Sequence, residues 1–92
     1  MTFEWDEAKE RYNIWKHGIR FITATSVFSD PFRLEIYDEM HSDDEVRYIT
    51  IGEIKSECMI LFVVYTERAE SIRIISARRA SSKERRLYYD RT

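Results

Sequence analysis

Hydrophobic and polar residues alternate with a helical period near the start of the chain. Within residues 7–17, Ala8, Tyr12 and Trp15 recur close to the spacing that places side chains on one face of an α-helix. An aspartate that can cap the N-terminus comes directly before this segment, and a glycine follows its last residue. We therefore predict a helix over residues 7–17. We expect Trp15, like Trp5, in the core rather than as a base-stacking platform.

A second helical pattern and a short strand lie on either side of this helix. Residues 21–28 carry apolar side chains at helical spacing, and Asp30 and Pro31 end the pattern with a turn. Residues 3–5 are too short for an independent strand, but their alternation fits an edge strand. The first third of the chain therefore predicts an edge strand followed by two helices.

The rest of the chain has the patterns of β-strands and a final helix. Residues 32–37 alternate apolar and polar side chains, and an acidic loop follows over 38–45. The uninterrupted apolar run from Met59 to Tyr65 predicts a central strand covered on both faces. A serine can begin a last helix that runs to Tyr89. Three strands joined by connections short enough for antiparallel hairpins are expected at residues 46–52, 58–66 and 71–77.

This order of elements predicts a single α+β domain over residues 1–92, built as a curved antiparallel sheet with helices packed on one face. The composition is 43% hydrophobic and 35% charged, with only two Gly and one Pro, so we expect order nearly throughout. The other face of the sheet is expected to stay partly open. Because arginines stand at the strand ends, that face is a surface on which a polyanion could lie.

The charge distribution supports the same surface. The net charge is −2, but residues 1–66 carry a formal charge of −6 and residues 67–92 one of +4. A positive field at the end of the chain attracts polyanions, although a solvated helix with internal salt bridges would also explain it.

Cys58 is the only cysteine, so the chain forms no disulfide within itself and no cysteine-rich zinc site. Without a signal-peptide pattern or a membrane-spanning run, we expect a cytoplasmic protein that does not bind membranes.

The candidate chemistry is that of a phosphodiester without a metal ion. The sequence has no glycine-rich phosphate loop, no HExxH, no GxSxG and no carboxylate pattern with metal-ligand spacing, so we expect neither a metal nor another cofactor. Its histidines, Glu67 and several arginines could instead deprotonate a ribose 2′-hydroxyl, stabilise a charged transition state and protonate a leaving oxygen. A non-catalytic subunit that binds nucleic acid for regulation is the alternative.

Four segments also resemble a known family. "FEWDEAKERYNIWKHG", "SVFSDP", "DEMHSDDEVRYITIG" and "VVYTERAESIRIISARRASSKER" are similar, in this order and over nearly the whole chain, to the BrnT family of bacterial type II toxins. The resemblance implies a RelE-like fold and a ribonuclease activity that arrests translation. It also implies a small BrnA-like antitoxin that neutralises the toxin, and a toxin–antitoxin complex that binds promoter DNA.

Two short motifs supply the candidate catalytic groups. His17, in "WKHG", is the best candidate for acid–base chemistry because its ordinary pKa lies near neutral pH, although it could simply stabilise the C-terminus of the helix. Lys16 is a candidate phosphate contact. Glu67 and Arg68, in "TER", are expected together at a hairpin turn, either over a groove or as a surface ion pair.

The remaining arginines are candidate phosphate contacts. Strand neighbours point to opposite faces, so we expect Arg73 and Arg79 on one face and Arg78 on the other, with either Arg78 or Arg79 in the groove. Arg47 is expected beside Tyr48 on the outer strand, and His41 is expected in an exposed loop. The expected catalytic residues are His17, Glu67, Arg68 and Arg78, and the expected RNA contacts are Lys16, Arg47, Arg73 and Arg79.

Overall fold

The computed structural model describes residues 1–42 and 44–90 of the 92-residue chain. The three α-helices of this part of the chain match the predicted segments closely, except that the second ends earlier and continues as a 3-10 turn over 26–29. The described helices and strands are β1 (Thr2–Trp5), α1 (Glu7–His17), α2 (Phe21–Thr25), β2 (Leu34–Tyr37), β3 (Tyr48–Ile54), β4 (Met59–Arg68), β5 (Ser71–Arg79) and α3 (Ser82–Asp90).

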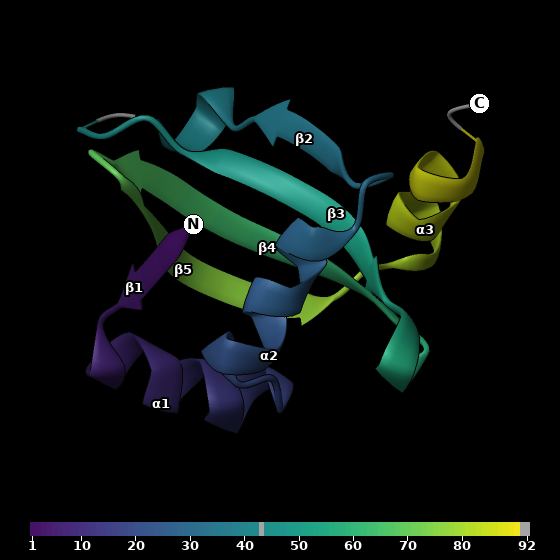
Figure 1. Ribbon diagram of the computed structural model, residues 1–92, viewed down its shortest axis with the longest axis horizontal. Coiled ribbons are helices and arrows are strands. Elements are labelled where there is room, and N and C mark those ends of the chain that lie inside the picture. The colour runs from purple at the N-terminus through teal and green to yellow at the C-terminus, as the bar shows by residue number, and fades with distance from the viewer. Residues whose placement is uncertain (43, 91–92) are drawn as a thin grey trace.

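The five strands form one twisted sheet in the order β1-β5-β4-β3-β2 (Figure 1). Strands β2 to β5 are joined in sequence order by antiparallel pairings, and β4 lies at the centre, as its apolar run predicts. The N-terminal strand pairs with β5 in parallel. The sheet is therefore mixed rather than purely antiparallel, because β1 runs in the same direction as its neighbour β5. The α+β class with a curved sheet is confirmed, and the RelE-like relationship stays a prediction.

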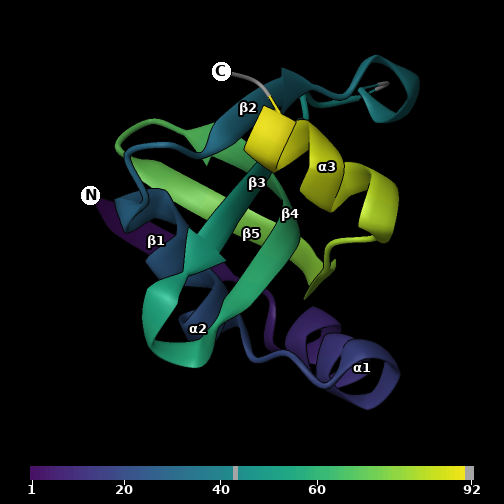
Figure 2. The ribbon, with the colours of Figure 1, turned by 90° about the vertical axis from the view of Figure 1, so that its right-hand side faces the viewer.

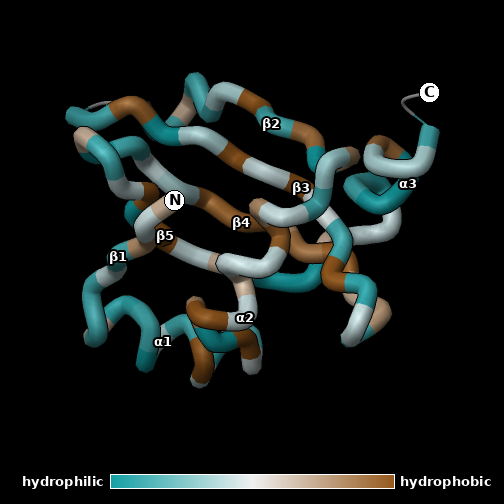
Figure 3. Tube along the Cα trace, in the orientation of Figure 1, coloured by the Kyte–Doolittle hydropathy of each residue, from teal (hydrophilic) through white to brown (hydrophobic). Residues whose placement is uncertain are grey.

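The main core lies between the sheet and the segment that contains α2. Phe21, Val27, Leu61 and Val63 are fully buried there, and half-buried aromatic residues of β1 pack against the same cluster. Figure 3 shows how hydrophobic positions gather along β3 and β4, whereas the start of α1 is hydrophilic. Trp5 packs edge-on against Phe21 with ring centroids 6.0 Å apart, so its predicted place in the core is confirmed.

The last helix packs on the opposite face of the sheet from α2. Tyr88 is its one buried residue, and it clusters with Ile51 and Ile60, whose side chains point away from the main core. Figure 2 shows α3 across the sheet from α2. The sequence predicted helices on a single face, and α3 differs because Tyr88 packs against Ile51 and Ile60 on the other face, where its hydroxyl also donates a hydrogen bond to Asp30.

A buried amide holds α1 against β5. β1 covers β5 only as far as Ile74, so the next residues of β5 have no strand on that edge. Asn13 fills the gap: its Oδ1 accepts from the Ala77 N–H at 3.0 Å, and its Nδ2 donates to the carbonyls of Ala77 and Ile19 at 2.9 Å each. The side chain thus acts in place of a strand neighbour. It fixes the last turn of α1 beside β5.

Candidate active site

A cavity of about 480 Å³ lies between α1 and β5. It opens beside the last turn of α1, which ends at Gly18 in the left-handed conformation (φ 71°), and the Gly18 N–H donates to the Ile14 carbonyl at 2.8 Å. The cavity brings the predicted residues Lys16 and His17 together with side chains from both elements. Its lining consists of Ala8, Lys9, Tyr12, Asn13, Lys16, His17, Ile75 and Ser76.

The imidazole in this cavity favours its neutral form. Partial burial is the main cause that lowers the pKa of His17 below 6.5, and the positive charges of Lys16 and Arg78 lower it further. The helix dipole usually raises the pKa of a histidine at a helix C-terminus, because it favours the positively charged ring. Burial and the two cations act against this and lower the pKa of His17. At pH 7 the ring is therefore mainly neutral. It can accept a proton from a substrate hydroxyl.

Arg78 approaches the same region from the end of β5. Its guanidinium carbon lies 3.9 Å from the centre of the Phe62 ring, and its two terminal nitrogens bond the carboxylate of Glu84 on α3 at 2.8 and 2.9 Å. This two-pronged ion pair raises the pKa of Arg78. Arg78 pairs with Phe62 and Ser76 pairs with Val64, so Arg78 shares a face of β5 with Ser76, which lines the cavity that holds His17. Arg79 lines a different cavity, with Cys58 and other residues.

A β-bulge changes which arginines share a face. The pairing of β4 with β5 shifts register, so Arg73 lies opposite Thr66 and Arg78 lies opposite Phe62. Thr66 and Phe62 are an even number of positions apart in β4, so their side chains point to the same face of the sheet. Their partners Arg73 and Arg78 therefore share that face. The expectation that Arg73 shares a face with Arg79 is therefore wrong, because the extra residue in β5 reverses the alternation.

Two further candidate arginines, like Arg78, already have acidic partners. The Arg73 guanidinium lies 2.7 Å from the carboxylate of Glu4 on β1, and Arg68 lies 2.6 Å from Glu45. Arg68 is at the far end of β4, where the ion pair with Glu45 raises its pKa. Such partly exposed pairs are weak enough to exchange for a phosphate, but neither arginine lines the cavity that holds His17.

Glu67 lies apart from the histidine. It lines a second cavity of about 390 Å³ on the α2 side of the sheet, together with Tyr48, Tyr65 and Arg33. In that cavity the Tyr65 hydroxyl donates to Glu35 at 3.2 Å, and burial is the main cause that raises the pKa of Tyr65. Odd and even positions of β4 face opposite sides of the sheet, and Glu67 is at an odd position, on the side of α2. It therefore lies away from the cavity that holds His17.

The loop before β3 holds the last two candidates. Arg47 is half-buried, and its main chain is tied to the loop: its carbonyl accepts from the Asp38 N–H at 2.9 Å and its N–H donates to Ser42 Oγ at 2.9 Å. His41 is exposed as predicted and contacts the Asp38 carboxylate at 3.0 Å. Neither residue lines the cavity beside α1.

Sequence reasoning missed Tyr12 and Ser76, which line the cavity, and Glu84, which holds Arg78. Tyr12 was treated as part of the apolar pattern of α1, yet it is 58% exposed. A tyrosine four residues before Lys16 shares its helix face, and this spacing was the available signal. Nothing local in the sequence indicates Ser76, because the bulge decides its orientation.

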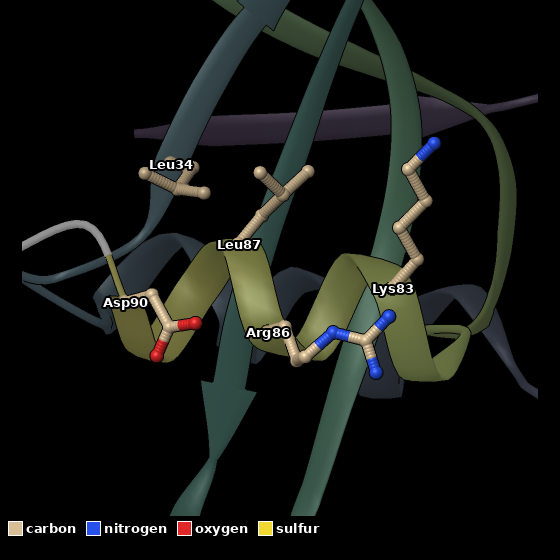
Figure 4. A pocket seen from close by; sticks show the side chains of 5 residues that line it. All are labelled: Leu34, Lys83, Arg86, Leu87 and Asp90. Carbon is tan, nitrogen blue, oxygen red and sulfur yellow. The ribbon is translucent and has the colours of Figure 1, made fainter.

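A further cavity, of about 520 Å³, lies between α3 and β2 (Figure 4). Leu87 projects from the helix toward the sheet, on the side where Leu34 lies, and Lys83, Arg86 and Asp90 complete the lining. This groove has cations but no imidazole, so it offers no base with a pKa near neutral.

Among the described residues, no group of three or more His, Cys, Asp or Glu side chains is placed to hold a metal ion. No helix in residues 1–42 and 44–90 is long and apolar enough to cross a membrane.

A neutral base beside two cations on one side of a sheet is suited to a phosphate-containing substrate. The chain matches, over residues 5–84, the family model described as the ribonuclease toxin, BrnT, of type II toxin-antitoxin systems. It therefore belongs to the BrnT family of ribonuclease toxins, and such a toxin has RNA as substrate and an antitoxin as partner. No curated protein matches the sequence.

Proposed function

We propose that this toxin is a metal-independent endoribonuclease in which His17 is the general base. The observation that carries the proposal is the cavity between α1 and β5, where a half-buried imidazole with a lowered pKa lies beside Lys16 and under the influence of Arg78. The base and the cations that a phosphodiester reaction needs are then on one side of the sheet. Glu67 has no catalytic role in this proposal, because it lines the other cavity.

The reaction is an internal transfer within RNA. His17 takes the proton of a ribose 2′-hydroxyl, and the 2′ oxygen forms a bond to the adjacent phosphorus. The bond from phosphorus to the 5′ oxygen of the next nucleotide breaks, and this leaving oxygen takes a proton from water. Lys16 and Arg78 stabilise the additional negative charge on the phosphate oxygens in the transition state. The products are a 2′,3′-cyclic phosphate and a 5′-hydroxyl.

The histidines of the chain allow a matched test. His17→Ala should lower the single-turnover cleavage rate by roughly 10² to 10⁴-fold, because a general base acts mainly in the transition state, while RNA affinity stays nearly unchanged. His41→Ala is the control, since His41 is the other histidine and lies in an exposed loop. Both assays are run in EDTA, in which the wild type should keep its rate. If His17→Ala is folded, binds RNA and cuts at the wild-type rate, His17 is not the base.

The cellular role follows from RNA cleavage. We propose that the enzyme acts in the cytoplasm and arrests translation by cutting cellular RNA, and that a BrnA-like antitoxin neutralises it. The complex of the two proteins would then bind promoter DNA through the antitoxin. Membership in a family of type II toxins supports this proposal, since the antitoxin of such a system must inhibit the ribonuclease. Arg68 and Arg73 would contact RNA by exchanging their present acidic partners for phosphates, with Arg47 as a further phosphate contact.

A further inference from the structure

The outward face of α1 is aromatic, although the sequence pattern suggested that it would be buried. Trp15 is 79% exposed and Tyr12 is 58% exposed, whereas the one buried residue of the helix is the polar Asn13. The expectation that Trp15 is a core residue is therefore wrong, because the amide of Asn13 anchors the helix and turns the large rings outward. Large exposed aromatic side chains next to each other often mark a binding surface.

The two rings and a neighbouring cation form one surface. The ring centroids of Tyr12 and Trp15 lie 5.8 Å apart with a tilt of 39° between the planes. The Lys16 amine lies 5.8 Å from the centre of the Tyr12 ring. An open aromatic surface with a cation at its border matches a nucleotide, whose base stacks on the ring while its phosphate meets the cation.

This surface continues into the cavity that holds the proposed base. Tyr12, Lys16 and His17 line the same cavity, and Ser76 of β5 supplies a half-buried hydroxyl on its opposite wall. Its volume of about 480 Å³ lies within the ~300–1,000 Å³ range of small-molecule sites. A nucleotide stacked on Tyr12 would therefore lie directly beside His17.

We infer that Tyr12 and Trp15 form a stacking subsite for an unpaired base of single-stranded RNA next to the bond that is cut. The inference rests on the proposed ribonuclease function and adds to it the residues that hold the nucleotide. A protein partner could also use exposed aromatic rings. RNA is favoured because Tyr12 shares its cavity with His17 and two lysines, and because no carboxylate is among the residues that line it.

Binding is tested with an RNA oligonucleotide that is 2′-O-methylated throughout, so that no 2′-hydroxyl is left to attack and the probe stays intact. Tyr12→Ala and Trp15→Ala should each weaken its binding by about 5- to 150-fold, since stacking on one aromatic side chain is worth roughly 1–3 kcal/mol per base. Trp15→Phe keeps a ring and should retain most of the affinity. Ile22→Ala is the matched control, because Ile22 is an apolar residue of α2 that is 54% exposed and does not line the cavity.

Two further measurements locate the base. The probe should quench tryptophan fluorescence in the wild type, and this quenching should disappear in Trp15→Phe, which leaves only the half-buried Trp5. Stacking releases no counterions, so Tyr12→Ala should keep the wild-type dependence of affinity on salt. Lys16→Ala should make that dependence less steep.

The outcomes separate this inference from the proposed chemistry. If the Ala variants bind the probe and cleave RNA as the wild type does, the stacking subsite is wrong and the ribonuclease proposal stands. If both variants keep RNA binding but lose the antitoxin, the aromatic surface binds protein and the inference is also overturned. If probe binding depends on both rings while His17→Ala cleaves normally, the subsite is supported and the role of His17 fails.

Discussion

The two helices that flank the end of β5, α1 and α3, are held by side chains of different chemistry. A buried neutral amide, Asn13, ties α1 to the main chain of Ala77 and of Ile19. An ion pair ties α3 instead: Glu84 bonds the guanidinium of Arg78, which is the residue after Ala77 in β5. The first attachment carries no charge and should not depend on salt or pH, whereas the second should weaken at high salt and in acid.

This difference matters for the candidate site because the two attachments meet at neighbouring residues. The helix that carries His17 is fixed by buried hydrogen bonds, so the proposed base has a defined position. Helix α3 is instead held by a partly exposed ion pair, in which the Arg78 side chain is 36% exposed and the Glu84 side chain 18% exposed. A rigid base and an exchangeable cation suit a site in which the cation must release a carboxylate to receive a phosphate.

Removing the buried attachment should have the largest effect. Asn13→Ala leaves the Ala77 N–H and two carbonyls without their partner, and each such group costs roughly 1–3 kcal/mol, so we expect a loss of about 3 kcal/mol or more. Urea unfolding measures the change. Arg11→Ala, on the exposed side of the same helix, is the control and should stay within ~0.5 kcal/mol. A loss below about 1 kcal/mol in Asn13→Ala would mean that α1 is held by something else.

Removing the exchangeable cation should change activity more than stability. Because Arg78 lowers the pKa of His17, Arg78→Ala should move the midpoint of the pH–rate profile upward, toward the ordinary value of 6.5. The cleavage rate rises with pH through this midpoint, since only the neutral ring accepts a proton. The slope of log affinity against log salt should also become shallower by about 0.7, as expected for one lost contact to a single strand.

Arg79→Ala is the matched control for that experiment. Arg79 is the neighbouring residue, but it lines a cavity away from His17. We expect the wild-type midpoint and the wild-type salt slope in this variant. Equal changes in Arg78→Ala and Arg79→Ala would show that the two arginines act only through net charge.

Local signals explain why much of the fold could be predicted. The bounds of α1 follow from residues within one turn of each end: Asp6 Oδ1 accepts from the Lys9 N–H at 3.0 Å, and Gly18 takes the left-handed conformation. The central place of β4 follows from its apolar run. The parallel pairing of β1 and the face chosen by α3 depend on contacts between distant residues, such as Tyr88 with Asp30, for which the local pattern carries no signal.

The candidate site was predictable only in part, for the same reason. His17 and Lys16 were found because their chemistry and their helix end can be recognised in a short motif. Glu67 was expected beside Arg68 at a hairpin turn, but the alternation of β4 places it on the other face from His17. The orientation of Arg73 depends on a bulge, and the exposure of Trp15 depends on a buried asparagine. A hydrophobic pattern gives the period of a helix, but not which face a single polar anchor will turn inward.

The smallest expected effect concerns the attachment of α3. Glu84 and Ser81 form a capping box: the Glu84 carboxylate accepts from the Ser81 N–H at 2.8 Å, and the Glu84 N–H donates to Ser81 Oγ at 3.2 Å. Glu84→Gln keeps a side chain that can cap the helix but removes the charge that Arg78 binds. At pH 7 we therefore expect a loss of only about 1 kcal/mol or less, because the pair is partly exposed.

The pH dependence of that loss distinguishes the ion pair from the cap. The hydrogen bond from Arg78 is the main cause that lowers the pKa of Glu84 below 4.5, so the stabilisation is present above pH 4.5 and disappears as the pH falls through the lower value in the folded state. Urea unfolding of wild type and Glu84→Gln should thus give curves that differ at pH 7 and converge in acid. A difference that stays constant down to acid pH would assign the loss to a poorer cap, and the attachment of α3 would then be no more sensitive to pH than that of α1.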